Sequence, residues 1–260
     1  MGPKGSLSFR CLAGPNRRNT ISSMEFPSPL ISGHLVRRYK RFLADCVLAD
    51  GTPITAHCPN TGAMLGCAEP GARVWLSHAE NPKRKYKFTW EIVETSPETL
   101  VGINTARANH LVVEAILAGK IPALQGYGRI QREVRFGREG SRVDILLEPH
   151  DGARPCYIEV KSVTAARPDG VAIFPDAVTT RGTRHLRELS YMVENHSRGV
   201  VFFCVQRSDV HEVRPADAID PDYGQTLRAA LANGVESMAW RVDISSQGIE
   251  LTDALPVVCP

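Results

Sequence analysis

The stretch from Asp144 to Lys161 constrains the chain most, because it predicts two strands joined by a turn, with charged side chains set among apolar ones. The segments RVDILLE and CYIEVKSV flank the turn sequence PHDGARP. Side chains alternate between the two faces of a strand, so Glu159 and Lys161 are expected to share one face. Folding the chain back at the turn brings Asp144 opposite residues 159–161. A register with an odd residue sum then places Asp144 on the same face as Glu159.

Two carboxylates and a lysine on one strand pair predict a candidate metal site. Carboxylate oxygens suit a hard divalent cation such as Mg²⁺ or Mn²⁺. Such a cation lowers the pKa of a bound water and neutralises charge on a phosphoryl oxygen, while a neighbouring lysine orients the nucleophile. The candidate catalytic residues are Asp144, Glu159, Lys161 and, on an upstream helix, Glu114, with the three carboxylates as candidate metal ligands. The alternative is a solvated hairpin whose charges form surface ion pairs of little consequence.

The first part of the chain predicts a small β-barrel. Between Leu30 and Glu94 the sequence contains five short strand patterns with turn residues between them and no helical stretch: LISGHLVRRY, FLADCVLAD, TPITAHC, RVWLSHA and YKFTWEIVE. Five such strands favour an OB-like barrel over residues 24–95, although other small β folds fit the pattern as well. Ser96 and Pro97 mark the expected domain boundary.

Residues 96–260 predict a second domain of mixed α and β structure. Asn104 to Ala118 has apolar residues at helical spacing, and the run GVVFFCVQR at 199–207 indicates a strand buried on both faces. A further helix is expected from Thr183 to about Asn195. Thr183 would cap this helix, and its first turn would present Arg184 and His185 to a phosphate. The equal alternative for this segment is an ordinary exposed amphipathic helix.

The composition sets limits on the class of protein. The first 23 residues hold four basic residues and no acid, and they predict a disordered extension or a true start at Met24. The seven scattered cysteines never form a CxxC pair, which indicates reduced thiols of a cytoplasmic protein rather than a disulfide framework or a zinc ribbon. No apolar run approaches the roughly 18 residues of a membrane-spanning helix. A net charge of +3 from 31 basic and 28 acidic residues does not identify a partner.

Two basic clusters lie in the first domain. The candidate nucleic-acid-binding residues there are Arg37, Arg38, Lys40 and Arg41, followed by Lys83, Arg84, Lys85 and Lys87. The second cluster is interleaved with Tyr86, Phe88 and Trp90, and such a mixture can follow a phosphate backbone and stack bases. The alternative is a solvated hairpin with its aromatic side chains in the core. The segment HCPNTG at 57–62 lacks a second ligand pair at zinc spacing and is interpreted as a structural turn.

Six blocks together resemble the sugar fermentation stimulation protein A family. In chain order they are HCPNTGAM at 57–64, NPKRKYKFTWE at 81–91, VGINTARAN at 101–109, YIEVKSVT at 157–164, FPDAVTTRGTRHLREL at 174–189 and FFCVQRSD at 202–209. The resemblance runs from about Met24 to the end of the chain. It implies an N-terminal OB-like domain, a C-terminal domain of the restriction-endonuclease-like fold, and DNA as the partner. The PD-(D/E)xK nuclease motif then falls on Asp144, Glu159 and Lys161, with Glu114 as the helix carboxylate.

Three functions stay open at this point. The first is a largely sequence-non-specific DNA-binding protein with an Mg²⁺- or Mn²⁺-dependent nuclease site. The second is a non-catalytic DNA-binding regulator of sugar (maltose) metabolism with a vestigial site, since this fold also hosts proteins without turnover. The third, a sugar-binding protein, is weaker because no aromatic sugar platform is identifiable, and a small-molecule ligand is not expected. The oligomeric state is open, with a homodimer among the alternatives.

Overall fold

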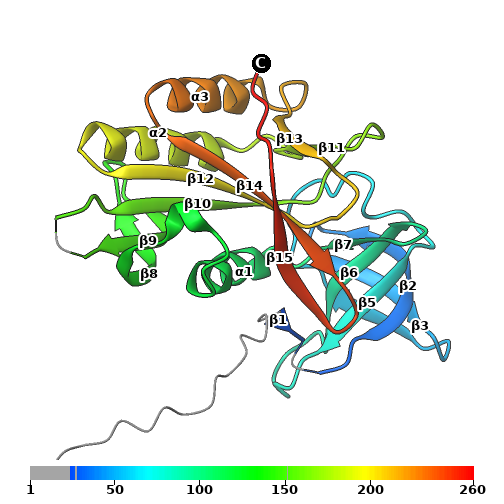
Figure 1. Cartoon of the computed structure of the whole chain (residues 1–260). Coiled ribbons are helices and arrows are strands. Elements are labelled where there is room, and N and C mark those ends of the chain that lie inside the picture. The colour runs from blue at the N-terminus through cyan, green and yellow to red at the C-terminus, as the bar shows by residue number, and fades with distance from the viewer. Residues whose placement is uncertain (1–23, 27, 151) are drawn as a thin grey trace, which may run out of the picture.

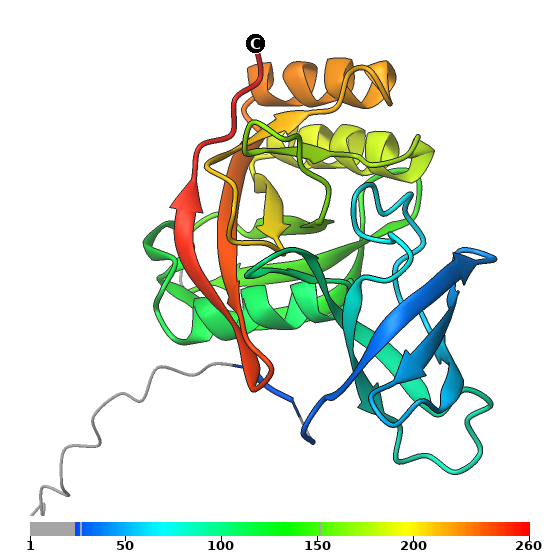
Figure 2. The same cartoon turned by 90° about the vertical axis from the view of Figure 1, so that its right-hand side faces the viewer.

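The computed structural model describes residues 24–26, 28–150 and 152–260. The extension expected at residues 1–23 lies outside them. The chain forms a β-barrel beside a larger mixed sheet that carries helices on both faces (Figure 1). Figure 2 shows the barrel and the large sheet side by side. Within the described residues, no helix is long and apolar enough to cross a membrane.

The barrel consists of the five strands that the sequence predicts. They are β2 (Ile31–Tyr39), β3 (Leu43–Leu48), β4 (Pro53–His57), β5 (Arg73–His78) and β6 (Phe88–Ser96). The order β4-β3-β2-β5-β6 closes because β4 also pairs with β6, in parallel, through Ala56 with Phe88 and His57 with Thr89. A barrel interior of this size is filled by side chains, here from a core that includes Leu35, Leu76 and Trp90. The predicted OB-like barrel is therefore confirmed.

One further strand, β7 (Thr99–Gly102), extends the barrel sheet alongside β6. The first domain thus reaches Gly102 and does not end at the boundary expected near Ser96. From β7 the chain passes directly into the second domain. The backbone N–H of Gly102 donates to the carbonyl oxygen of Gln206 at 2.9 Å, which ties the end of the barrel sheet to the second domain.

The second domain is built on a seven-stranded sheet in the order β1-β15-β14-β12-β10-β9-β8. Its strands are β1 (Met24–Glu25), β8 (Tyr127–Phe136), β9 (Ser141–Pro149), β10 (Cys156–Val163), β12 (Arg198–Val205), β14 (Glu236–Ile244) and β15 (Gly248–Leu255). A small parallel pair, β11 (Val171–Phe174) and β13 (Glu212–Pro215), and a 3₁₀ turn, η1 (Pro122–Leu124), complete the β and turn elements. The central strands β10, β12 and β14 are parallel, and β9 and β15 flank them antiparallel. The predicted mixed-sheet domain is confirmed.

Helices cover both faces of this sheet, α1 (Ala106–Leu117) on one and α2 (Thr180–Glu194) with α3 (Pro221–Ala232) on the other (Figure 1). Strand β12 contributes Val200, Phe202 and Cys204 to the core under α1, and its alternate residues to the core under α2 and α3. The prediction of a strand buried on both faces is therefore confirmed. Strand β12 and its neighbour β10 thus lie at the centre of the domain.

Polar groups join the two domains where α1 begins. Glu91 of β6 is 2 % exposed and accepts hydrogen bonds from Ser77 Oγ at 2.6 Å, Asn104 Nδ2 at 3.0 Å and Arg107 Nε at 2.7 Å. Nearby charge and hydrogen bonds are needed to hold a carboxylate inside a protein. This cluster fixes the start of α1 against the barrel, and thereby the face of α1 that meets the large sheet.

Candidate functional site

The site lies where strands β9 and β10 stop pairing. Their ladder joins Cys156 to Leu147, Tyr157 to Leu146 and Ile158 to Ile145, an odd-sum register as expected, and it ends before Glu159. Beyond that point a side chain replaces the partner strand. Asp144 Oδ2 accepts a hydrogen bond from the backbone N–H of Val160 at 2.7 Å.

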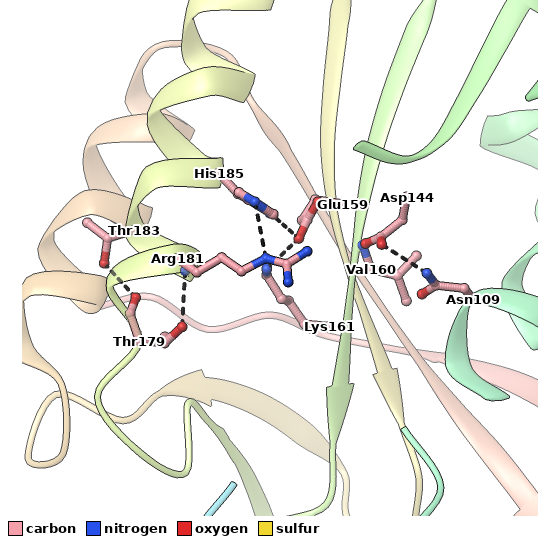
Figure 3. A network of polar contacts seen from close by, with 10 residues as sticks. Asn109, Asp144, Glu159, Val160, Lys161, Thr179, Arg181, Thr183 and His185 are labelled. Carbon is pink, nitrogen blue, oxygen red and sulfur yellow. Dashed lines mark hydrogen bonds and ion pairs between the residues drawn. The ribbon is translucent and has the colours of Figure 1, made fainter. Parts of the chain in front are cut away.

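The carboxylate of Asp144 is oriented by helix α1. Its Oδ1 accepts a hydrogen bond from Asn109 Nδ2 at 2.9 Å (Figure 3). Burial, and next the negative charge of Glu159, raise the pKa of Asp144 to about 6 although Asn109 and Val160 donate to it. Asp144 is therefore close enough to Glu159 for the charge of Glu159 to raise its pKa, although no hydrogen bond joins the two carboxylates.

Glu159 is held from the other side of strand β10. Its Oε1 accepts a hydrogen bond from Lys161 Nζ at 2.7 Å and a short one from His185 Nδ1 on α2 (Figure 3). Glu159 and Lys161 are 3 % and 8 % exposed. Burial alone would raise the pKa of Glu159, but the Lys161 charge and the His185 hydrogen bond outweigh it, and the pKa is lowered. The prediction that Glu159 and Lys161 share one face is confirmed.

The two carboxylates do not lie on one face, so that part of the sequence-based prediction is wrong. Val143 packs in the core under α2 and α3, whereas Ile145 packs in the core under α1, so the alternation of side chains slips at Asp144. The neighbouring strand is irregular at the same level, where Glu133 has a φ of +55°. Asp144 consequently turns toward α1 and Glu159 toward α2, and the two approach β10 from opposite sides.

Glu114 does not join the cluster. Glu114 lies five positions after Asn109, which is about 140° around a helix of 3.6 residues per turn. Glu114 instead lines a small cavity with Leu111, Lys120 and Glu250. The residue of α1 that reaches Asp144 is the amide Asn109, which the sequence did not single out.

The described part of the chain holds no group of three His, Cys, Asp or Glu side chains at metal-binding distance. A single unpartnered oxygen atom nevertheless indicates that a divalent cation fits the cluster. Glu159 Oε2 is buried and has no hydrogen-bond partner among the described residues, which is costly for a charged oxygen unless a cation binds it. Glu159 and Asp144 are the residues that would hold such an ion.

Helix α2 begins earlier than the sequence suggested. Thr179, not Thr183, is the capping residue, and its hydroxyl accepts from the backbone N–H of Gly182 at 3.0 Å. His185 therefore lies in the second turn and not in the first, and it is buried, with 1 % of its surface exposed. Arg184 is half-buried, and the side chain of α2 that lies beside the cluster is Arg181.

Some basic side chains of the barrel are exposed to solvent, and others are hydrogen-bonded within the protein. Lys40 and Arg41 are exposed at the tip of the β2–β3 hairpin, and Lys83 and Lys85 are exposed in the loop between β5 and β6. Arg38 is hydrogen-bonded within the protein, because one of its terminal nitrogens donates to the carbonyl oxygens of Arg41, Asn60 and Gly62 within 2.9 Å. A surface role therefore falls on the exposed members only.

The remaining members of the two clusters have partners or neighbours of their own. Arg37 is paired with Asp45 at 2.9 Å, and Lys87 Nζ donates to the carbonyl oxygen of Pro82 at 2.6 Å. Arg84 is half-buried, and its positive charge helps to lower the pKa of His57, although burial contributes more. Trp90 is fully buried in the barrel core, so it is not available to stack a base.

Family models match both domains. The model described as the SfsA N-terminal OB domain matches residues 36–103, and the model described as the sugar fermentation stimulation protein RE domain matches residues 106–248. Together they cover most of the chain.

Whole-chain comparisons agree with these matches. A sugar fermentation stimulation protein homolog of Alkalilimnicola ehrlichii is 58 % identical over 238 residues, which is 91 % of this chain and 100 % of that protein. A homolog of Thioalkalivibrio sulfidiphilus is 57 % identical over 90 % of this chain and 98 % of its own length. The solved structure of Pyrococcus furiosus SfsA in complex with Ca²⁺ matches with a TM-score of 0.82 and 27 % identity, over 92 % of this chain and 100 % of that one. The chain belongs to the sugar fermentation stimulation protein family.

Proposed function

We propose that the protein is a cytoplasmic, largely sequence-non-specific DNA-binding protein that hydrolyses DNA phosphodiester bonds with the help of Mg²⁺ or Mn²⁺. The observation that carries the proposal is the unpartnered, buried Oε2 of Glu159. The other oxygen of this carboxylate accepts from Lys161, and its negative charge acts on the nearby Asp144. The Ca²⁺ in the structure of the Pyrococcus furiosus relative supports binding of a divalent cation in this family.

Each residue of the cluster would have a distinct role in such a reaction. Asp144 and Glu159 would bind the cation, whose chemistry when bound is to activate a water and to neutralise charge on the phosphate. Lys161, a buried ammonium donating to Glu159, would orient the attacking water and stabilise the charge that develops on the phosphate oxygens. The exposed Lys40, Arg41, Lys83 and Lys85 would contact the DNA backbone, which accounts for binding without sequence preference.

The second candidate is a DNA-binding regulator of sugar metabolism without catalysis. The observation that favours it is the separation of the two carboxylates, since each oxygen of Asp144 already accepts a hydrogen bond on the α1 side of β10. In that case the basic barrel surface would carry the function, and the acidic cluster would be a remnant.

Cleavage assays separate the two candidates. Wild type and Lys161→Ala are incubated with linear, nicked and single-stranded DNA, in Mg²⁺ or Mn²⁺ and in EDTA. We expect cleavage by wild type but not by Lys161→Ala, and only with metal. Lys120→Ala is the matched control and should cleave as wild type does, because Lys120 pairs with Glu250 outside the cluster. Cleavage that survives chelation or the Lys161 substitution contradicts the nuclease, and DNA binding without metal-dependent cleavage by wild type favours the regulator.

A further inference from the structure

His185 occupies a buried position between two polar groups of the site. It lies in the second turn of α2 and is 1 % exposed. Its Nδ1 is hydrogen-bonded to Glu159 Oε1, and its Nε2 accepts a hydrogen bond from Arg181 Nε at 3.4 Å (Figure 3). A buried polar ring needs a partner for each nitrogen, and these two contacts supply both.

The contact with Arg181 determines which nitrogen of His185 carries the proton. A guanidinium only donates hydrogen bonds, so Nε2 offers its lone pair and Nδ1 carries the hydrogen. Nδ1 therefore donates to Glu159. The hydrogen bonds run in one direction, from Arg181 through His185 to Glu159.

Two donors converge on the same oxygen of Glu159. His185 Nδ1 and Lys161 Nζ both donate to Oε1, whereas Oε2 is buried and accepts from no group that the structure describes. The carboxylate is thus fixed at one oxygen and left open at the other. Groups behind a metal ligand orient it in this way, and their loss typically weakens metal binding.

We infer that His185 is a positioning residue, which holds Glu159 so that Oε2 is free for a divalent cation, while Arg181 sets the hydrogen-bonding direction of His185. The inference rests on the proposed function, because it assigns how the same site keeps its ligand in place. Neither His185 nor Arg181 touches the reacting atoms in this role.

Three substitutions of His185 separate the hydrogen bond from simple packing. Asparagine places an amide donor near the position of Nδ1, glutamine places its amide near Nε2, and alanine removes both. Mn²⁺ affinity, measured by electron paramagnetic resonance without DNA, should fall about 10–100-fold in His185→Ala and His185→Gln. His185→Asn should restore most of the affinity. Arg181→Ala should weaken binding less, and Arg187→Ala, an arginine of the same helix paired with Glu139, should leave it unchanged.

The outcomes distinguish this inference from the proposed function. If wild type binds no Mn²⁺, the metal-dependent function fails. If wild type binds Mn²⁺ and the folded His185→Ala variant binds it equally well, only the positioning role is overturned. Equal losses in His185→Asn and His185→Gln also overturn it, because packing rather than the bond to Glu159 would then be responsible. That pair decides the matter even if His185→Ala does not fold.

Discussion

The backbone N–H of Val160 donates its hydrogen bond to the side chain of Asp144 and not to a neighbouring strand. Val160 lies between Glu159 and Lys161, so the Asp144 carboxylate is tied to the main chain of the same segment that carries the other two charges. This bond fixes Asp144 in a place where its negative charge is poorly solvated, and its pKa rises to about 6.

Asp144→Asn should remove a fall in stability that the metal-free wild type shows between about pH 4 and about pH 6. The pKa of Asp144 lies above its ordinary value of 3.8 in the folded state. The folded protein therefore keeps a proton that the unfolded chain loses, and stability declines as pH rises from about 4 to about 6. The variant cannot titrate there, so relative to wild type it should gain about 1–2 kcal/mol between pH 4 and pH 7.5. Its amide nitrogen cannot accept the hydrogen bond that one carboxylate oxygen accepts, and this loss is the same at every pH.

Urea denaturation of both proteins in EDTA, from pH 4 to pH 8, measures this difference. The stability of wild type should fall relative to that of the variant from about pH 4, where Asp144 is largely protonated in the folded protein, to about pH 7.5. Glu80→Gln, which replaces an exposed carboxylate in the loop between β5 and β6, serves as the control and should show no such trend. A constant difference between Asp144→Asn and wild type across the pH range would contradict the assignment of the raised pKa to Asp144.

Lys161→Met should destabilise the protein by about 3–5 kcal/mol, because it leaves the buried charge of Glu159 without its cation. Adding Glu159→Gln to the same chain should recover most of that loss, since no buried charge then remains. Thermal and urea unfolding check both variants, and a double-mutant cycle gives the coupling energy. Neither protein should cleave DNA; stability that does not recover in the double variant would show that the ion pair is not the cause.

Asn109→Ala should weaken Mn²⁺ binding about 10-fold, whereas Glu114→Gln should leave it nearly unchanged. Asn109 donates directly to Asp144, and Glu114 lines a cavity on another side of α1. Calorimetric titration with Mn²⁺ compares the two variants under one set of conditions. The reverse order of effects would restore Glu114 as the helix carboxylate of the site.

Lys40→Gln combined with Arg41→Gln should weaken DNA binding and flatten its dependence on salt. Each lost phosphate contact lowers the slope of log K against log salt by about 0.9. Fluorescence anisotropy with a labelled duplex, over a range of salt concentrations, measures both quantities. Arg37→Gln is the matched control, because Arg37 is already paired with Asp45. An unchanged slope in the double variant would place the DNA on another surface.

Gly137→Ala should destabilise the protein more than Gly140→Ala does. Both glycines have a φ near +70°, which an alanine adopts at a cost of about 1–2 kcal/mol. A Cβ at Gly137 would also overlap the carboxylate of Glu188, a buried group that accepts from the backbone N–H of Arg138 at 2.6 Å, whereas a Cβ at Gly140 would meet open space. Urea unfolding of the two variants gives the difference directly, and equal losses would mean that the Glu188 contact is unimportant.

The sequence predicted most elements of the fold because the apolar patterns match the final burial. The strand at 198–205 was identified from an unbroken apolar run, and the helix that contains Asn109 from its spacing of apolar residues. The short strands β11 and β13 were not predicted, because four residues pairing only with each other leave too weak a pattern.

The sequence predicted part of the site, and the features that it did not predict have physical explanations. Placing the cap at Thr183 instead of Thr179 assigned His185 to an exposed first turn, when it lies buried against Glu159. Asn109 carries no charge, so nothing in its type distinguishes it, and the rotation of α1 that selects it over Glu114 is set by packing against the sheet. The strand irregularity at Asp144 likewise depends on neighbours that are distant in sequence.

Strand β1 has a consequence for the order in which the protein is completed during synthesis. Met24 and Glu25 pair with Ile249 and Gly248 of β15, and Phe26 belongs to the core under α1. The chain thus begins with the edge strand of the large sheet and then forms the barrel and the other strands of the sheet. The partner of that edge strand, β15, is the last strand to be made. While the polypeptide is still emerging from the ribosome, this edge has no partner, and the domain that carries the cluster closes only when both ends of the described chain have met.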